Sequence, residues 1–336
     1  MISRRTKIVS YLYFKIISKA LNPFNASFRF SYSKKNTNRT IYMADGSIVH
    51  GGLTDRNKGL LTSYYLAKKH NTPFSIFYIS PVNYANFWHS NKINITKLII
   101  NPFKFKVWLV SSIDELKELN EVKSEVFLKK TNLLYVNENI LAYLNNNGNW
   151  EKPTQKLYNE LDLLGENHVK TSFKKDYFDY VSKDFEILHF RCLNYLNDFD
   201  DSKILPIAED QIIIALDKLR NHLEEQHENL KNKVFISDSR RLLNYFKDKG
   251  YRVFSTKTTK HMDNPGHSII EYMRGYQENH LITLAKSVNS YTFYFNRQQP
   301  FNSHFAYYPA IFGNVPFHKF GYNLKNFMVT DLIGEK

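Results

Sequence analysis

From residue 40 onward, short apolar runs alternate with longer segments in which apolar positions recur with a helical period. In the first half, the pattern predicts strands over Thr40–His50, Phe74–Ile79, Lys106–Val110 and Leu133–Val136, and helices over Thr54–His70, Ile113–Leu119 and Thr154–Leu164. In the second half, it predicts strands over Phe185–Cys192, Lys233–Ser237, Tyr251–Ser255 and Tyr291–Phe295, and helices over Ile207–Leu230, Ser239–Lys249, His267–Val288 and Asn302–Phe312. This alternation favours an α/β fold with parallel, doubly wound sheets.

Open parallel sheets bind their ligands outside the carboxyl ends of the strands. We therefore expect site residues just after Val49, Arg191, Ser237 and Asn296. The length of 336 residues, with 43% apolar residues, is enough for two domains and excludes a disordered chain. We place a basic amphipathic segment at residues 1–38, an N-terminal α/β domain at 39–165 and a C-terminal α/β domain at 166–336.

The charge of the chain is concentrated at one end. The net charge is +14, and nine basic residues with no acidic residue lie between Met1 and Arg39, which leaves 37 basic against 32 acidic residues elsewhere. A nucleic-acid-binding domain usually spreads its excess charge over a surface, so we expect no nucleic-acid partner. No apolar stretch reaches the length of about 18 residues that a membrane-spanning helix needs. The single cysteine, Cys192, excludes an intrachain disulfide and a Cys-based zinc cluster, and is interpreted as a core thiol.

The segment Lys7–Leu21 has lysines opposite an apolar helical face. That arrangement is typical of a helix that lies in a membrane interface. The alternative is a helix packed on the body of the protein, and the sequence leaves both open.

The first candidate site is the turn between the first strand and the first helix. Gly51 and Gly52 would let the backbone approach a ligand, and the start of the following helix offers free N–H groups and a positive dipole end. Thr54 is a plausible N-cap, and Asp55 and Arg56 follow it. The alternative is that the two glycines form an ordinary turn.

The second and third candidate sites follow two later strands. His189 and Arg191 lie on the same side of their strand, and an arginine at a strand's carboxyl end can hold a diphosphate through two parallel hydrogen bonds. Asp238 could accept from a ribose hydroxyl or a base N–H. The alternatives are a structural ion pair for Arg191 and a simple helix cap for Ser239.

The fourth candidate site is the start of the last predicted helix, where Asn302, Ser303 and Phe305 lie. Free N–H groups there could receive phosphate oxygens, and the alternative is an ordinary N-cap. Asp198 and Asp200 form an Asp-x-Asp pair that could hold Mg²⁺ or Mn²⁺. Because the pair lies in a polar segment past the strand, we interpret it as a solvated loop and expect no metal site.

The order of these motifs resembles the GT-B fucosyltransferases. The matching residues are Gly-Gly-Leu-x-Asp-Arg at 51–56, His-x-Arg at 189–191, Ser-Asp-Ser at 237–239 and Asn-Ser-x-Phe at 302–305, and the resemblance spans about Ile41 to Phe317. The sequence departs from the family at Leu193-Asn194, where Gly-Asp often follows the His-x-Arg motif, and at His304 and Tyr307.

The resemblance implies two Rossmann-like domains that face a cleft, with the acceptor on the N-terminal side and the nucleotide sugar on the C-terminal side. It implies transfer of fucose from GDP-fucose with inversion, without a metal or other cofactor. Arg191 and the helix start at Asn302-Ser303 would stabilise the leaving GDP, and Asp238 and Ser239 would hold the nucleoside. His189 would orient the phosphate or the loop.

In the acceptor domain, the resemblance leaves Asp55 as the carboxylate to take the acceptor's proton, or as the partner of Arg56 or Arg191 in an ion pair. Arg56 could instead reach the donor phosphates. The acceptor would be a glycan or a lipid-linked oligosaccharide of a bacterial surface polysaccharide, handled in the cytoplasm at the inner membrane face.

Two other functions stay open from the sequence. One is a non-catalytic relative that binds a nucleotide or a glycan. The other is a metal-dependent transferase that uses Asp198 and Asp200.

Overall fold

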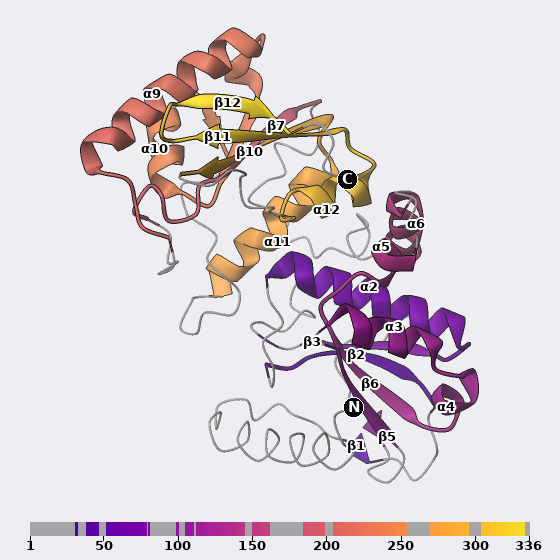
Figure 1. Cartoon of the computed structure of the whole chain (residues 1–336). Helices are drawn as coiled ribbons and strands as arrows, with labels where there is room; N and C mark the ends of the chain where they lie inside the picture. Colours follow the sequence, from indigo (N-terminus) through magenta and orange to yellow (C-terminus); the bar gives the residue numbers. More distant parts are fainter. Residues whose placement is uncertain are drawn as a thin grey trace. The chain divides into compact units, whose positions relative to one another are not determined.

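The chain forms two compact units, Met1–Lys170 and Thr171–Lys336, in a computed structural model (Figure 1). The structure describes residues 31–32, 38–46, 52–78, 80, 99–100, 105–110, 112–144, 150–161, 184–198, 204–254, 269–295 and 304–332. The helix expected over Lys7–Leu21 lies outside these ranges. The predicted domain boundary after residue 165 and the predicted cleft stay predictions, and each unit is described by itself.

The first unit is built on a four-stranded parallel sheet with the order β3-β2-β6-β5. The strands are β2 (Thr40–Ala44), β3 (Phe74–Tyr78), β5 (Phe105–Val110) and β6 (Thr131–Val136), and a separate parallel pair joins β1 (Ser31–Tyr32) to β4 (Ile99–Ile100). The helices are α2 (Leu53–Lys69), α3 (Ile113–Glu121), α4 (Ser124–Leu128), α5 (Ile140–Leu144) and α6 (Glu151–Leu161). The strand order reverses between β2 and β6, so their carboxyl ends flank the place where such sheets take a ligand.

Helix α2 packs against the sheet at backbone contact. A Cβ atom added at Gly59 would lie 1.7 Å from the carbonyl oxygen of Val136, the last residue of β6. Only glycine permits this approach, because any side chain would push α2 off the sheet. The contact fixes the height of α2 above the carboxyl end of β6.

The second unit contains a six-stranded sheet with the order β12-β11-β10-β7-β8-β9. The strands are β7 (Glu186–Arg191), β8 (Val234–Ser237), β9 (Arg252–Val253), β10 (Ser287–Tyr294), β11 (Phe317–Asn323) and β12 (Met328–Asp331). All neighbours are parallel except β12, which runs antiparallel to β11. Numbered along the chain, the order is that of a Rossmann sheet, with its reversal between β7 and β10.

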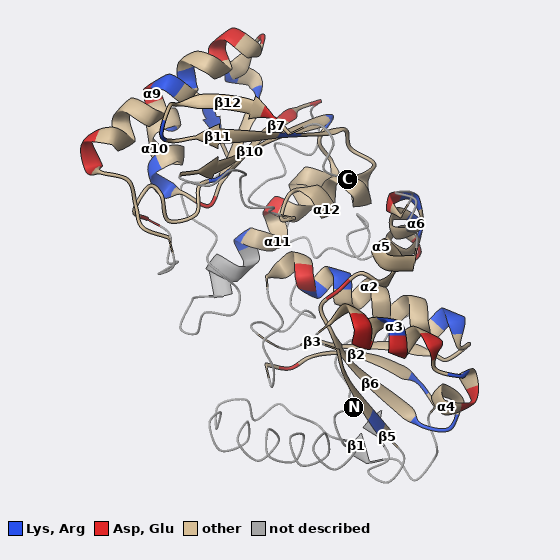
Figure 2. Ribbon diagram, in the orientation of Figure 1, with Lys and Arg blue, Asp and Glu red and all other residues tan. Residues whose placement is uncertain are grey.

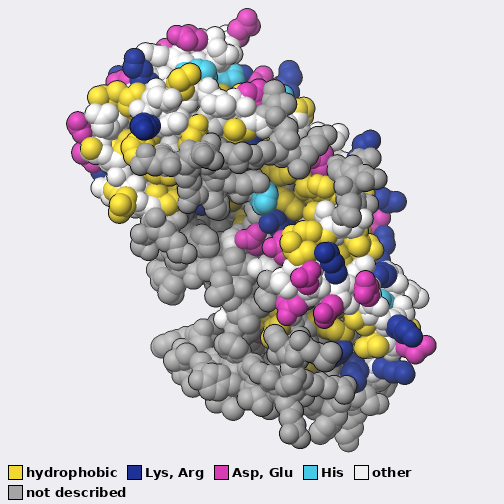
Figure 3. All heavy atoms as spheres, viewed as in Figure 1, with side chains coloured by type: hydrophobic (Ala, Val, Ile, Leu, Met, Phe, Trp, Pro, Cys, Tyr) yellow, Lys and Arg dark blue, Asp and Glu magenta, His cyan; other side chains and the backbone are white. Residues whose placement is uncertain are grey.

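The helices of the second unit are α9 (Glu209–Gln226), α10 (Arg240–Asp248), α11 (Ile269–Thr283) and α12 (Tyr307–Gly313). In both units the strands carry few charged residues, whereas Lys, Arg, Asp and Glu are frequent along α2, α3 and α9 (Figure 2). On the face of the described surface shown in Figure 3, apolar, acidic and basic side chains are interspersed.

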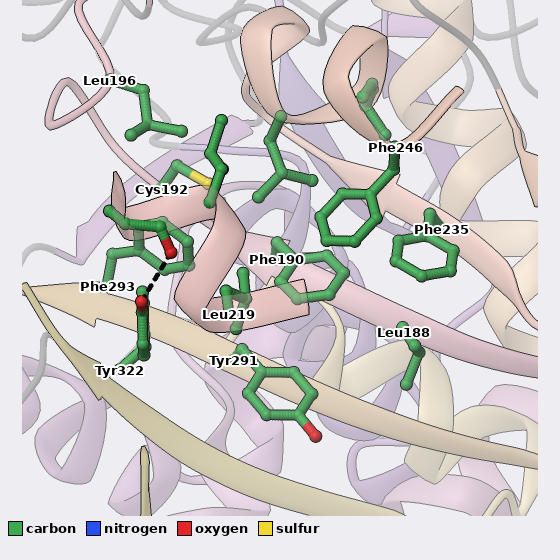
Figure 4. Close-up of a cluster of buried hydrophobic side chains, with 14 of the residues drawn as sticks. Leu188, Phe190, Cys192, Leu196, Leu219, Phe235, Phe246, Tyr291, Phe293 and Tyr322 are labelled. Atoms are coloured by element: carbon green, nitrogen blue, oxygen red, sulfur yellow. Dashed lines mark hydrogen bonds between the residues drawn. The ribbon is translucent and has the colours of Figure 1, made fainter. Parts of the chain in front are cut away.

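Aromatic rings hold β7 in the core of the second unit (Figure 4). The Phe190 ring lies 5.6 Å from the ring of Phe235 on β8 and 5.3 Å from that of Tyr291 on β10, measured between centroids. Leu188 lies on the same side of the strand as Phe190 and belongs to the same buried cluster. Because side chains alternate along a strand, this packing commits His189 and Arg191 to the other face.

The predicted α/β class with parallel sheets is confirmed, and several predicted boundaries are wrong. The first strand ends at Ala44 rather than at His50, since Gly46 turns the chain with a φ of +81°. Helix α2 has its N-cap at Gly52, not at Thr54. The last helix begins at Tyr307 rather than at Asn302, and β11 and β12 were not predicted. In the part of the chain that the structure describes, no helix has the length and apolar character needed to cross a membrane.

Candidate functional site

The candidate site lies at the carboxyl ends of β7 and β10, where the strand order of the second unit reverses. The register sets His189 beside Ser290 and Arg191 beside Thr292. Nδ1 of His189 lies 2.8 Å from Oγ of Ser290, so a hydrogen bond joins the two strands at this point. The sequence predicted His189 and Arg191 here but gave no role to Ser290.

Arg191 forms an ion pair with Asp238, which follows β8. Nη1 of Arg191 donates to Oδ2 of Asp238 at 2.8 Å, and the side chains are 20% and 3% exposed, respectively. The alternative interpretation of Arg191, a structural ion pair, is therefore what the structure contains. The Arg191 side chain as a whole nevertheless remains partly exposed at the carboxyl end of β7.

The Asp238 carboxylate also accepts hydrogen bonds from the backbone. The N–H of Cys192 donates to Oδ1 at 2.7 Å, and the N–H of Leu193 donates to Oδ2 at 3.0 Å. Burial raises the pKa of Asp238, and Arg191 and these N–H groups oppose that rise. Asp238 was predicted to accept from a nucleoside, but in this structure its oxygens are occupied by donors of the protein.

The turn after Arg191 has a left-handed residue. Leu193 has a φ of 54°, a conformation that favours glycine, and it stands where the resembled family often has glycine. Asn194 takes the position of the family's aspartate, and its Nδ2 donates to the carbonyl of Ile204 at 2.9 Å. The shape that a glycine would favour is therefore retained at this turn, although the residue is a leucine.

The N-terminus of α10 is closed by two side chains. Ser239 is the N-cap and its Oγ accepts from the N–H of Leu242 at 3.1 Å, which confirms the capping interpretation. Ser239 Oγ also donates to Oδ2 of Asp198 at 2.9 Å, and the N–H of Arg241 donates to the same oxygen at 2.7 Å. A carboxylate already satisfies this positive helix end.

The sequence analysis placed Asp198 in a solvated loop. That prediction is wrong, because Asp198 caps the N-terminus of α10. Burial raises the pKa of its carboxyl group. Asp200, its partner in the Asp-x-Asp pair, lies outside the described residues. Within the described ranges, no three His, Cys, Asp or Glu side chains are grouped as a metal site would require.

His189 is buried and uncharged. It is 3% exposed, and burial, with a contribution from Arg191, lowers its pKa to about 3. Its ring stacks on that of Phe305 with 5.8 Å between centroids. A neutral imidazole between Ser290 and Phe305 is suited to orienting the chain before α12, whereas it brings no positive charge to a phosphate. Asn302 and Ser303 lie outside the described residues.

Cys192 follows Arg191 and is fully buried, as expected of a core thiol. Burial raises its pKa well above the ordinary value for a thiol. A thiol in this state is not an activated nucleophile.

In the first unit, the side chains of Asp55 and Arg56, which follow the Gly-Gly turn, bind groups of the first unit itself. Asp55 accepts from the N–H of Gly52 at 3.2 Å and pairs with Nζ of Lys58 at 3.0 Å. Arg56 is buried, and its Nη1 donates to the carbonyl of Ser80 at 2.9 Å. Gly51 lies outside the described residues.

Sequence reasoning missed Asp45, which directly follows β2 at the reversal point of the first sheet. The hydroxyl of Tyr135 on β6 donates to Oδ2 of Asp45 at 2.9 Å. An acidic residue directly after the apolar run Thr40–Ala44 was the signal. It was overlooked because the strand was expected to continue to His50.

No family model matches the chain, and no curated protein matches it. Among solved structures, the chain is similar to NodZ, an alpha-1,6-fucosyltransferase, soaked with GDP-fucose: the TM-score is 0.46 at 14% identity, over 88% of this chain and 98% of that one. It is similar to the fucosyltransferase NodZ from Bradyrhizobium, with a TM-score of 0.49 at 12% identity over the same shares. A mutant of Arabidopsis thaliana FUT1 in complex with GDP gives a TM-score of 0.46 at 10% identity, over 94% of this chain and 78% of that one.

Proposed function

We propose that the chain is a glycosyltransferase that binds a nucleotide sugar at the carboxyl edge of the second sheet. The observation that carries the proposal is the position of Arg191, a partly exposed arginine at the end of β7, beside the point where the strand order reverses. Rossmann sheets bind nucleotides at this point, and a guanidinium there suits a diphosphate because it offers a planar fork of N–H donors.

The chemistry that such a site supports is sugar transfer to a hydroxyl. The bond between the anomeric carbon and the diphosphate oxygen breaks, the acceptor oxygen bonds to that carbon, and the acceptor's proton passes to a base. The diphosphate leaves with its electron pair, and Arg191 would stabilise the negative charge that develops on it. Asp55 remains the carboxylate that we propose as the base, since its side chain is 38% exposed and able to reach solvent.

We propose GDP-fucose as the donor and inversion as the stereochemical course. The support is the order of the four motifs in the sequence, which resembles that of GT-B fucosyltransferases. The GDP and GDP-fucose in the solved structures named above only indicate which nucleotide to test first.

Calorimetry with GDP, UDP and CDP tests the donor. We expect GDP to bind tightest to the wild-type protein and the Arg191→Ala variant to lose most of that affinity. Tighter binding of UDP would overturn the assignment to GDP-fucose, and binding of no nucleotide would overturn the proposed function.

The transfer is proposed to need no metal. Oδ2 of Asp198, half of the only Asp-x-Asp pair that the sequence offered as a metal site, is engaged by the start of α10. Turnover of GDP-fucose in EDTA should equal that in Mn²⁺. Loss in EDTA with recovery in Mn²⁺ would favour the metal-dependent alternative, and GDP binding without turnover would favour a non-catalytic relative.

We also propose that the basic segment of residues 1–38 contacts anionic lipid at the inner membrane face, where a lipid-linked acceptor would lie. Each basic residue near such a surface contributes about 1 kcal/mol of attraction. Sedimentation with phosphatidylglycerol vesicles tests this, with neutral phosphatidylcholine vesicles as the control. Equal sedimentation with both would contradict it.

A further inference from the structure

Four donors surround the carboxylate of Asp238. Arg191 Nη1 and the N–H of Leu193 reach Oδ2, at 2.8 and 3.0 Å, while the N–H of Cys192 reaches Oδ1 at 2.7 Å. The hydroxyl of Ser237 lies 3.5 Å from Oδ1. A carboxylate offers about four lone-pair sites, and the three short hydrogen bonds fill three of them. Because the Asp238 side chain is only 3% exposed, a ribose or a base has little access to the fourth.

The donors come from the ends of two neighbouring strands. Phe190 of β7 is in register with Ser237 of β8, so the chain leaves both strands at the same level of the sheet. Asp238 therefore ties the turn after β7 to the turn after β8. It is also the group that accepts the N–H of left-handed Leu193, at the place where glycine would adopt that conformation without strain.

We infer that Asp238 is a positioning residue. It holds the Arg191 guanidinium and the Cys192–Leu193 turn in their places before the donor arrives, and it makes no contact with the donor itself. The inference rests on the proposed function, because Arg191 is taken to be the group that meets the diphosphate.

The Asp238→Asn variant separates the two possible roles of Asp238. Asparagine keeps the shape but has a single acceptor oxygen, and its NH₂ group would face N–H groups that now donate to a carboxylate. The turn and Arg191 should then lose their fixed positions. If Asp238 acts only through Arg191, the Asp238→Asn variant should weaken nucleotide binding only while Arg191 is present.

The experiment is a double-mutant cycle of Asp238→Asn and Arg191→Ala, with GDP binding measured by calorimetry. With Arg191 present, Asp238→Asn should weaken GDP binding about tenfold or more, as expected for a hydrogen bond to a charged group. In the Arg191→Ala background, the same change should alter binding by less than about twofold. Asp184→Asn, which removes an exposed ion pair with Lys286 at the opposite end of β7, is the matched control and should leave binding unchanged.

An equal loss in both backgrounds would show direct contact with the nucleotide and overturn the inference. The same cycle, measured by urea unfolding without ligand, keeps the inference testable if the wild-type protein binds no GDP. If the two substitutions then lower the free energy of unfolding additively, the inference is overturned, because Asp238 and Arg191 would not depend on each other. If Asp238→Asn does not fold, amide exchange in the wild-type protein decides: the N–H of Leu193 should be protected, and exchange at the rate of an open loop would overturn the inference.

Discussion

The N–H of Leu193 donates to Oδ2 of Asp238 at 3.0 Å while Leu193 itself has a φ of 54°. A buried carboxylate thus holds a β-carbon-bearing residue in a conformation that costs about 1–2 kcal/mol for residues other than glycine. The leucine side chain is 4% exposed and packs in the core, which offsets part of that cost. Backbone strain and core burial therefore meet at one residue next to Arg191.

We expect Leu193→Gly to be more stable than Leu193→Ala by about 0.5–1 kcal/mol. Both changes delete the same buried side chain, but only alanine retains the strain of the left-handed backbone. Urea unfolding of the two variants measures the difference. Leu216, buried in the interior of α9, is the matched control, because there the alanine variant should be the more stable one by about 1 kcal/mol. The same order at both positions would contradict the strain at Leu193.

Gly59→Ala should destabilise the first unit by about 2–3 kcal/mol. The new Cβ would lie 1.7 Å from the carbonyl oxygen of Val136, and the nearest atoms are backbone that cannot rotate away. Gly52→Ala is the control, since no atom lies within 4 Å of the added Cβ there. Thermal unfolding should show a large shift only for Gly59→Ala. Similar shifts for both variants would mean that α2 does not touch β6 so closely.

Lowering the pH should reveal the buried neutral state of His189. In the unfolded chain a histidine titrates near its ordinary value of about 6.5, whereas burial lowers the pKa of His189 to about 3. Between about pH 3 and pH 6.5, the unfolded state binds a proton at this histidine that the folded state does not. The contribution of His189 to the free energy of unfolding is therefore complete above about pH 6.5 and is lost as the pH falls. The free energy of unfolding should decrease by up to about 1.4 kcal/mol per pH unit from this group.

The comparison that isolates this contribution is the His189→Gln variant. Its stability should fall less steeply than that of the wild-type protein between about pH 6 and pH 4, since the other buried histidines are common to both proteins. Parallel curves would mean that His189 is protonated in the folded protein.

Arg191→Ala should slow turnover of GDP-fucose by about 2–4 kcal/mol in activation free energy, the range found when one donor to a developing anion is removed. The reason is the loss of the guanidinium from the end of β7. Arg220→Ala is the control, because Arg220 forms ion pairs with Asp217 and Glu224 on α9 and should not affect turnover. A folded Arg191→Ala protein that keeps more than about a tenth of the activity would contradict the proposed role.

The alternation of apolar runs and helical segments was sufficient to predict the parallel α/β class and to place Arg191 at a strand end. It did not predict the partner of Arg191, because Asp238 lies 47 residues away and the pairing depends on β7 and β8 becoming neighbours. The role of Asp198 was missed for the same reason. Its position in the sequence resembles a polar loop, and only the packing of that loop against α10 makes it a cap.

The end of the first strand was placed too late although Asp45-Gly46 is a usual turn signal, because apolar residues resume soon after it. The left-handed turn at Leu193 could not be predicted, because leucine gives no indication of that conformation. The edge strand β12 and its neighbour β11 were missed because β12 is largely exposed and β11 is only partly buried, so neither shows a run of buried apolar residues.

The neighbouring positions of β7 and β10 have a consequence for how the second unit folds. His189 and Ser290 lie 101 residues apart in the chain, and closing a loop of that length costs about 4 kcal/mol of entropy, somewhat more than the shorter closure between Arg191 and Asp238. Long-range parallel pairing is intrinsically slow, so β7 and β8 should pair before β10 docks beside them. During refolding, Arg191 would meet Asp238 early, and the carboxyl edge of the second sheet would be completed only when β10 pairs with β7.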